Sequence, residues 1–286
     1  MSVRMPPTVS PERPADAVPS EASGAETRLA VMFALIALVL AAAIDGFLIE
    51  PKWIVVNQYH VAAPLSFRGP LKIAHLSDLH TKGMGRRERR LLELLKAEQP
   101  DLIVVTGDTL HSSANYKAVH ELLGQLHAPL GVWVVRGNWE NWHPVKDERG
   151  FYASAGVNFL VNEARPVRGN VWVVGLDDPS SGHPHLDQAL EGVQADAYTI
   201  VLMHSPAHFK HVAGHCALAL AGHTHGGQVR IPFVHPFWLP RGSSDYLEGW
   251  YQQEGSKMYV SRGIGTSVLP LRFLCRPELA IVTLGK

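Results

Sequence analysis

Short apolar runs recur along the chain from residue 71 onward, and amphipathic stretches separate several of them. A short apolar run bounded by turn residues is typical of a buried strand, whereas apolar positions three and four apart indicate a helix. The pattern predicts strands at 71–76, 102–105, 132–135, 171–174, 199–203, 216–220, 258–261 and 279–284, and helices at 86–98, 116–126 and 207–213. Strand, helix and strand in succession predict parallel crossovers, and the later strands suggest an α/β fold of two packed sheets with helices outside.

A longer apolar stretch precedes these elements. Every residue of 29–44 is apolar, and the stretch resumes after Asp45 and Gly46 through Ile49. This length is enough for a helix to cross a bilayer, and the stretch is apolar on all faces, which favours a membrane anchor over a buried core helix. Residues 1–27 hold almost no large apolar side chains and are expected to form a disordered tail. We therefore expect a tail at 1–27, a transmembrane anchor at 28–50 and one globular domain at 51–286.

The charges beside the anchor give only a slight bias in orientation. Arg28 precedes the anchor and Lys52 follows it, with Arg4 and Arg13 farther toward the N-terminus. Positive residues favour the cytoplasmic side, so the charges slightly favour an N-terminus on the cytoplasmic side of the cell membrane. Residues 41–43 are three alanines, small residues of the type that signal peptidase cuts, although the polar region before the apolar stretch is long for a signal peptide. Cleavage there would release the globular domain outside the membrane, and both alternatives stay open.

Polar side chains follow the predicted strands at the points where they end. The stretch 221–228 is the densest case, because its two histidines lie between glycines that permit a tight turn and a close approach to the backbone. The carboxyl ends of strands in open parallel sheets are where ligands bind, so we expect a site at this edge. The side chains brought there are Asp78, His80, Asp108, Asn138, His204, His223 and His225.

This mixture of oxygen and nitrogen donors is typical of a metal centre. It offers enough ligands for two ions and suits Mn, Fe, Zn or similar metals better than Ca or Mg alone. Asp108 is the natural bridging ligand, because it lies between the others in the chain and its carboxylate has two oxygens to share. Two such ions can clamp a phosphoryl group and convert water to hydroxide near neutral pH. The pattern therefore predicts hydrolysis of a phosphoester, with Asp108 and Asn138 as catalytic as well as ligating residues.

Composition narrows the possible partners. Lys+Arg 26 against Asp+Glu 26 gives a formal net charge of zero, which removes the electrostatic case for a nucleic-acid partner. The two cysteines, Cys216 and Cys275, are too few to define a disulfide scaffold. We expect a monomer whose fold depends on its apolar core.

The order of the polar blocks is D-x-H, G-D, G-N-x-[DE], H and G-H-x-H. From residue 71 to the C-terminus this order resembles the calcineurin-like metallophosphoesterases. The segments 222–232 (GHTHGGQVRIP), 259–265 (YVSRGIG) and 277–284 (PELAIVTL) resemble their membrane-anchored bacterial branch of short phosphodiesterases, which includes relatives that hydrolyse UDP-2,3-diacylglucosamine. The resemblance implies a four-layer αββα sandwich. It also implies one metal held by Asp78, His80, Asp108 and His225, and a second held by Asp108, Asn138, His204 and His223.

One position departs from the family pattern. Members of the family usually carry a histidine after the conserved asparagine, where it contacts the phosphate and helps to protonate the leaving oxygen, but this chain has Trp139. An indole donates one hydrogen bond and cannot act as an acid near pH 7. We expect Trp139 to contact substrate and activity to favour leaving groups that need no proton. His111 and His143 could substitute as acids, although a role as exposed loop histidines is the plainer interpretation.

Two further features have two interpretations each. Arg262 could pair a substrate phosphate, as could Arg272, but surface roles are equally compatible with the sequence. The apolar loop at 232–240, with Phe233, Phe237 and Trp238 among prolines, could pack under the sandwich or form a lipid-facing lip.

Together these features predict a membrane-anchored, two-metal phosphodiesterase or pyrophosphatase that acts on a lipid-linked or nucleotide substrate. The alternatives are a phosphomonoesterase or nucleotide phosphatase, and a non-hydrolytic relative that binds metal and phosphate. The complete set of seven competent ligands argues against the non-hydrolytic relative.

Overall fold

The computed structural model describes residues 21–63, 67 and 69–285, with side chains from residue 24 onward. The chain divides into two compact units, Met1–Ala42 and Ala43–Lys286. In unit 1, helix α1 (Glu21–Ile44) begins within the segment that was predicted to be a tail, and residues 1–20 of that prediction lie outside the described residues. The helical stretch from Gly24 to Lys52 is long and apolar enough to cross a membrane. Its large apolar side chains are exposed, which fits a lipid environment better than a protein core.

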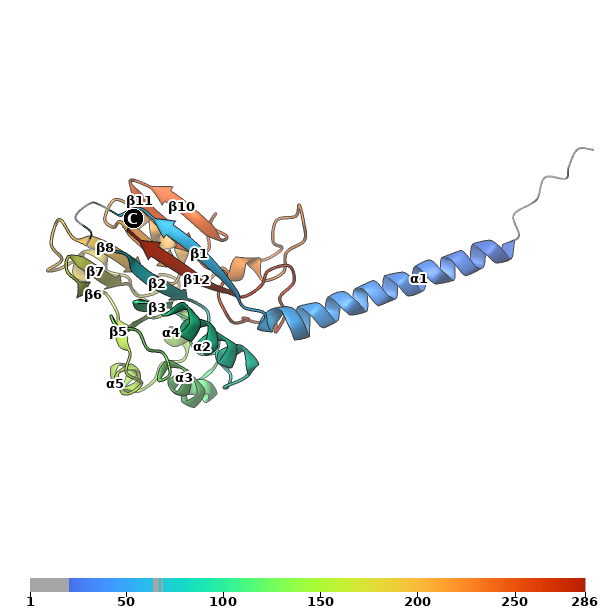
Figure 1. Ribbon diagram of the computed structural model, residues 1–286, viewed down its shortest axis with the longest axis horizontal. Helices are drawn as coiled ribbons and strands as arrows, with labels where there is room; N and C mark the ends of the chain where they lie inside the picture. The colour runs from blue at the N-terminus through green and yellow to red at the C-terminus, as the bar shows by residue number, and fades with distance from the viewer. Residues whose placement is uncertain (1–20, 64–66, 68, 286) are drawn as a thin grey trace, which may run out of the picture. The chain divides into compact units, whose positions relative to one another are not determined.

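Unit 2 contains two six-stranded sheets (Figure 1). The first sheet has the strand order β1 (Val55–Val61), β12 (Glu278–Leu284), β2 (Leu71–Leu76), β3 (Leu102–Thr106), β4 (Val132–Val135) and β5 (Asn158–Leu160). All neighbours in it are parallel except β12 and β2. The second sheet has the order β10 (Gly249–Gln253), β11 (Ser256–Val260), β9 (Leu218–Ala221), β8 (Tyr198–Leu202), β7 (Val171–Gly175) and β6 (Glu163–Arg168). Only its two outermost pairs are antiparallel.

Helices cover the outer face of each sheet. Leu91 and Leu122 pack with residues of β2 and β3 in one apolar cluster, and Phe209 packs with residues of β8 and β9 in another. The α-helices of unit 2 are α2 (Arg86–Glu98), α3 (Tyr116–Leu123), α4 (Asn138–Trp142), α5 (Glu148–Ser154), α6 (Leu186–Ala189) and α7 (Phe209–Val212). The short helices of other types are η1 (Asp45–Ile49), η2 (Glu50–Lys52), η3 (Ser113–Asn115), η4 (Pro206–His208) and η5 (His225–Gly227).

A third apolar cluster lies between the two sheets. Ile73 and Val104 of the first sheet pack there against Val173 and Ile200 of the second. With a helical layer outside each sheet, the order of layers is helix, sheet, sheet and helix, and the predicted four-layer α/β sandwich is confirmed.

The predicted strands are all present, but several elements carry no clear apolar signal and were not predicted. β6 contains Pro166 and β10 reads GWYQQ, and both are edge strands with partly exposed side chains. Edge strands are short and bury only part of their surface, so their sequence pattern is weak.

Candidate metal centre

Five loops after β2, β3, β4, β8 and β9 carry the candidate ligands, and all seven side chains are buried. Because β2, β3 and β4 are parallel neighbours, as are β8 and β9, their carboxyl ends deliver these loops to one edge of each sheet. The structure brings all seven residues into one continuous cluster, in which each side chain lies within 3.5 Å of another member. The members are Asp78, His80, Asp108, Asn138, His204, His223 and His225.

The backbone at this cluster has an uncommon conformation. Asp78, His80, Asp108, His223 and His225 all have positive φ angles, from 41° to 71°. Such angles cost free energy in residues other than glycine and cluster at functional sites. The surrounding fold therefore holds these loops in place against their local preference.

Two glycines make the close approach of the loops possible. A Cβ atom at Gly222 would lie 1.7 Å from Oγ of Ser77, and one at Gly137 would lie 2.2 Å from Oδ1 of Asp108. Any side chain at either position would push a ligand loop away from the cluster.

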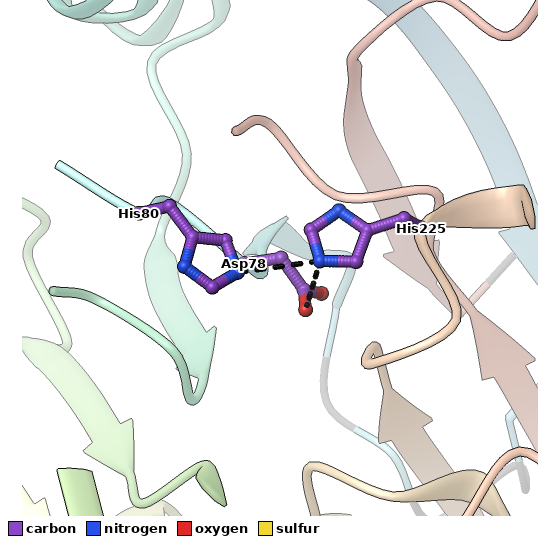
Figure 2. Close-up of side chains that lie close together, drawn as sticks. All are labelled: Asp78, His80 and His225. Carbon is purple, nitrogen blue, oxygen red and sulfur yellow. Dashed lines mark hydrogen bonds and ion pairs between the residues drawn. The ribbon is translucent and has the colours of Figure 1, made fainter. Parts of the chain in front are cut away.

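Asp78, His80 and His225 form one part of the cluster, which we call the first half-site (Figure 2). Nε2 of His225 lies 3.3 Å from Oδ1 of Asp78 and 3.3 Å from Nε2 of His80. Figure 2 shows the two imidazole rings on either side of the Asp78 carboxylate, with ring nitrogens directed toward one another. This arrangement can hold a cation.

Asn138, His204 and His223 form the second half-site. Nε2 of His204 lies 3.1 Å from Oδ1 of Asn138 and 3.0 Å from Nδ1 of His223. Asp108 lies between the half-sites, because its Oδ2 is 3.5 Å from Nε2 of His80 and 3.3 Å from Nε2 of His204. Asp78 is also close enough to Asp108 and His204 to share an ion with them.

The donor atoms fit a metal ion. Oδ1 of Asp78 is buried and has no hydrogen-bond partner among the described residues, whereas Oδ2 accepts from Oγ of Ser77 and the backbone N–H of His223. In the second half-site, Nδ1 of His204 lies 2.8 Å from the Thr106 carbonyl and Nε2 of His223 lies 2.6 Å from the Arg241 carbonyl. A carbonyl can only accept, so each ring donates there and turns its other nitrogen toward the centre.

The electrostatics of the cluster favour a bound positive charge. Burial lowers the pKa of His80 and of His225 well below the ordinary value, and burial together with His204 lowers the pKa of His223 to about 4. These imidazoles are therefore neutral, as ligands must be. Burial alone would lower the pKa of His204, but the attraction of Asp108 outweighs it and raises this pKa.

Glu140 holds the loop of Asp108, a role that the sequence pattern did not reveal. Its buried carboxylate accepts hydrogen bonds from the backbone N–H groups of Gly137 at 2.8 Å, Asp108 at 2.9 Å and Thr109 at 2.7 Å, and from Oγ1 of Thr109 at 2.8 Å. The available signal was its place three residues after Gly137 at the start of a helix, the spacing of a capping box.

Trp139 lies beside the first half-site. Its ring meets that of His80 edge-on, with centroids 5.1 Å apart, and stacks on the ring of His111 at 5.0 Å. Its backbone N–H donates to Oδ1 of Asp108 at 2.9 Å. The ring of His143 is also close to the indole, with centroids 5.7 Å apart. Both histidines considered as substitutes are thus gathered around Trp139.

The two arginines differ from one another. Nε of Arg262 lies 3.6 Å from Glu248 and 3.5 Å from Glu278, so its charge is already shared by two carboxylates. Arg272 is fully buried, and its guanidinium donates to the carbonyl groups of Arg262, Gly263, Gly265 and Cys275. For Arg272 the surface role is wrong, since this side chain lies inside the protein and bonds the loops together.

Comparison with known proteins agrees with this geometry. A model of the family described as calcineurin-like phosphoesterase matches residues 71–227. Over 250 residues the chain is 31% identical to the uncharacterized metallophosphoesterase YkuE of Bacillus subtilis, covering 82% of this chain and 87% of YkuE. Over 248 residues it is 29% identical to the phosphodiesterase YaeI of Escherichia coli, covering 82% of this chain and 90% of YaeI.

A vertebrate protein is also similar. Over 244 residues the chain is 28% identical to a transmembrane protein with metallophosphoesterase domain from Danio rerio, covering 77% of this chain and 54% of that protein. The narrower resemblance to hydrolases of UDP-2,3-diacylglucosamine is not confirmed by these matches and stays a prediction. The match to the family model and the similarity to YkuE show that the chain belongs to the calcineurin-like phosphoesterases.

Proposed function

We propose that this phosphoesterase is a two-metal phosphodiesterase or pyrophosphatase. The observation that carries the proposal is the position of Asp108, whose Oδ2 lies within 3.5 Å of a nitrogen ligand of each half-site. One ion would be held by Asp78, His80, Asp108 and His225, and the other by Asp108, Asn138, His204 and His223. Such a pair of ions supplies a nucleophile at neutral pH and stabilises the charge of a transferring phosphoryl group.

The protein groups around this centre orient it and shield it. Asp108 is the shared ligand, and the backbone N–H of Trp139 together with Glu140 fixes its carboxylate and its loop. Asn138 is the first residue of helix α4, and its side-chain oxygen points toward His204. Manganese, iron and zinc all suit this mixture of imidazole and carboxylate donors.

The indole of Trp139 limits the chemistry of the leaving group. It occupies the place beside His80 where members of the family usually carry a proton-donating histidine. Without an acid at this position, a poor alkoxide leaving group departs slowly, because general acid catalysis is typically worth about 10² to 10⁴ in rate. The substrates that fit are therefore phosphoanhydrides and phosphodiesters with a stable leaving group.

The proposal extends to a membrane anchor. The helical stretch from Gly24 to Lys52 could span a bilayer, and the similar protein from Danio rerio is named a transmembrane protein. We assign the anchor to 28–50 and the catalytic domain to 51–286, with the N-terminus on the cytoplasmic side and the protein as a monomer. A lipid-linked phosphoester fits this location better than a free nucleotide.

Hydrolysis of bis-p-nitrophenyl phosphate by the detergent-solubilised full chain tests the catalytic proposal. We expect turnover that EDTA abolishes and Mn²⁺ restores, and a loss of at least about 10³-fold in Asp108→Ala. Asp187→Ala, which removes an exposed carboxylate on α6, is the matched control and should keep full activity. A non-hydrolytic relative would instead bind Mn²⁺ without any turnover in the parent chain.

A further inference from the structure

Two loops of unit 2 carry large apolar side chains into solvent. We call residues 229–240 and 266–274 together the apolar lip. Phe237 is 78% exposed and Trp238 is 60% exposed, which is costly in water for side chains of this size. Aromatic residues with neighbouring apolar side chains are typical of membrane–water boundaries. The other exposed members of the lip are Ile231, Phe233, Val234, Val268, Leu269 and Leu274.

Backbone hydrogen bonds join the two loops into one surface. The N–H of Arg230 donates to the Phe273 carbonyl at 2.8 Å, and the N–H of Phe273 donates to the Gln228 carbonyl at 3.0 Å. The side chain of Gln228 also donates to the Leu269 carbonyl at 3.0 Å. The apolar side chains are therefore held outward by polar bonds behind them, and the predicted alternative of packing under the sandwich is wrong for Phe233, Phe237 and Trp238.

The lip is hydrogen-bonded to residues 46–50, the segment that follows helix α1. Within unit 2, the N–H of Arg272 donates to the Gly46 carbonyl at 3.0 Å, and the carboxylate of Glu50 accepts from the backbone N–H groups of Leu274 and Cys275. The exposed apolar residues of η1 lie in the same segment. The last residues of the proposed anchor, from Gly46 to Glu50, therefore lie beside the lip.

A cationic cavity of about 550 Å³ adjoins the lip. Lys52, Lys82 and Arg86 line it, together with Phe47 of η1 and Pro270 of the lip. Its one acidic residue among the described residues, Glu88, is paired with Arg87 at 2.7 Å. These three cations are exposed and form no ion pair within the described part of the chain. Neither loop of the lip contains an acidic residue. This distribution of charge complements anionic headgroups.

The lip also adjoins the metal centre. It begins four residues after His225, and the carbonyl of Arg241, just past its first loop, is the hydrogen-bond partner of His223. A second cavity of about 370 Å³ has Phe233 and Leu274 on its apolar wall, and Arg230, Arg262 and their partner Glu248 on its charged wall. An amphiphile could place its apolar part on the lip while its phosphoester reaches the metal centre.

We propose that the apolar lip and the cationic cavity form a binding surface for an anionic phospholipid bilayer, and that the substrate is an amphiphilic phosphoester taken from that bilayer. The statement about substrate rests on the proposed phosphodiesterase function. The statement about bilayer contact rests on the lip, the cavity and their attachment to the anchor segment.

Fluorescent labelling of the full chain in vesicles tests bilayer contact. Phe233→Cys and Phe237→Cys, each carrying an environment-sensitive fluorophore, are compared with Ala195→Cys, an exposed position before β8 at the opposite ends of the strands. The parent chain, which retains Cys216 and Cys275, supplies the background. In phosphatidylglycerol vesicles containing nitroxide lipid, we expect at least threefold stronger quenching at both lip positions than at residue 195. Equal quenching at all three positions would overturn the proposal.

Activity separates this inference from the proposed function. We expect Phe237→Ser to lower the ratio of turnover on a vesicle-embedded phosphodiester to turnover on bis-p-nitrophenyl phosphate by about tenfold, the equivalent of losing one buried aromatic side chain. An unchanged ratio would overturn the bilayer-bound substrate while the hydrolase stands. Absence of metal-dependent turnover on both substrates in the parent chain would overturn the hydrolase, and the quenching result would still decide bilayer contact.

Discussion

The two half-sites use similar ligands but are held differently. In the second, the nitrogen of His204 that faces away from the centre bonds to a backbone carbonyl, and so does that of His223. In the first, Nδ1 of His80 and Nδ1 of His225 make no hydrogen bond of ordinary geometry to a described residue. A hydrogen bond with the Leu110 backbone raises the pKa of His80, but burial and the neighbouring positive charges, which lower this pKa, have larger effects.

This difference bears on metal affinity. A ligating imidazole whose other nitrogen donates to a carbonyl has a fixed tautomer and orientation and is more basic. Both rings of the second half-site are held in this way before an ion arrives. In the first, the outer nitrogen of His225 has no such partner, and the ring of His80 has only a weak hydrogen bond with the Leu110 backbone. We expect the second half-site to bind the tighter ion and the first to bind the exchangeable one.

The largest expected effect is on the two affinities. Titration of the metal-free chain with Mn²⁺, followed by electron paramagnetic resonance, should give two classes of site whose dissociation constants differ by about 10- to 100-fold. His204→Ala should remove the tighter class and His80→Ala the weaker one. Loss of the tighter class in His80→Ala would show that the first half-site binds the tighter ion. A single class in the parent would show that the two half-sites do not differ in affinity.

Glu140→Gln tests whether the loop that carries the shared ligand, Asp108, must be held by a carboxylate. An amide has one acceptor oxygen where the carboxylate has two, so it cannot accept all four hydrogen bonds from Gly137, Asp108 and Thr109. We expect turnover of the soluble diester to fall about tenfold, because loss of such an outer partner typically costs about 10- to 100-fold. Glu121→Gln on an exposed face of α3 is the control and should behave as the parent. Equal activity in the two variants would show that Asp108 needs no such support.

Much of this centre could be predicted from the sequence, because its ligands directly follow apolar strands. Asp78, Asp108 and His204 each come within three residues of a predicted strand end, and parallel strands end at a common edge. The partners behind the ligands could not be predicted in this way. The Thr106 and Arg241 carbonyls are backbone atoms, and no residue type identifies them.

Some elements of the fold also could not be predicted from the sequence. Strands β3 and β8 are buried along almost their whole length and give nearly continuous apolar runs. β1 instead alternates with exposed positions and pairs with β12, more than two hundred residues away. The role of Arg272 likewise could not be predicted, because the four carbonyls that surround its charge come together only when the loops are folded.

Trp139→His places an acid beside the weaker half-site. With a proton donor next to His80, a poor leaving group gains more than a good one, so we expect about a tenfold rise on an alkyl phosphodiester and less than about twofold on an aryl one. Parallel assays of both substrates measure the difference. Trp139→Phe, which restores no acid, is the control for packing. Equal gains on both substrates would contradict the proposed role of the missing acid.

The smallest expected effect concerns the loop behind Asp78. Backbone N–H groups of Ile264 and Gly265 bond to the Ser77 and Asp78 carbonyls, and Glu278 holds this loop through the backbone N–H of Arg262. Burial alone would raise the pKa of Glu278, but the attraction of Arg262 and its hydrogen bonds outweigh burial and lower it. The ionised form therefore stabilises the fold at neutral pH, and this contribution is lost as the pH falls through the lowered pKa.

We expect Glu278→Gln to be less stable than the parent by about 1.5 to 3 kcal/mol at pH 7, the usual worth of hydrogen bonds to a charged group. The loss should appear as a lower midpoint of thermal unfolding, and the difference should shrink as the pH falls below about 4, where the carboxyl group of the unfolded parent is protonated. The other partners of the Glu278 carboxylate, Asn57, Tyr59 and Tyr259, carry no proposed metal ligand. We therefore expect the weaker class of Mn²⁺ sites, which includes Asp78, to lose affinity and the tighter class to keep it. A pH-independent difference in stability would mean that the side chain acts through packing and not through its charge.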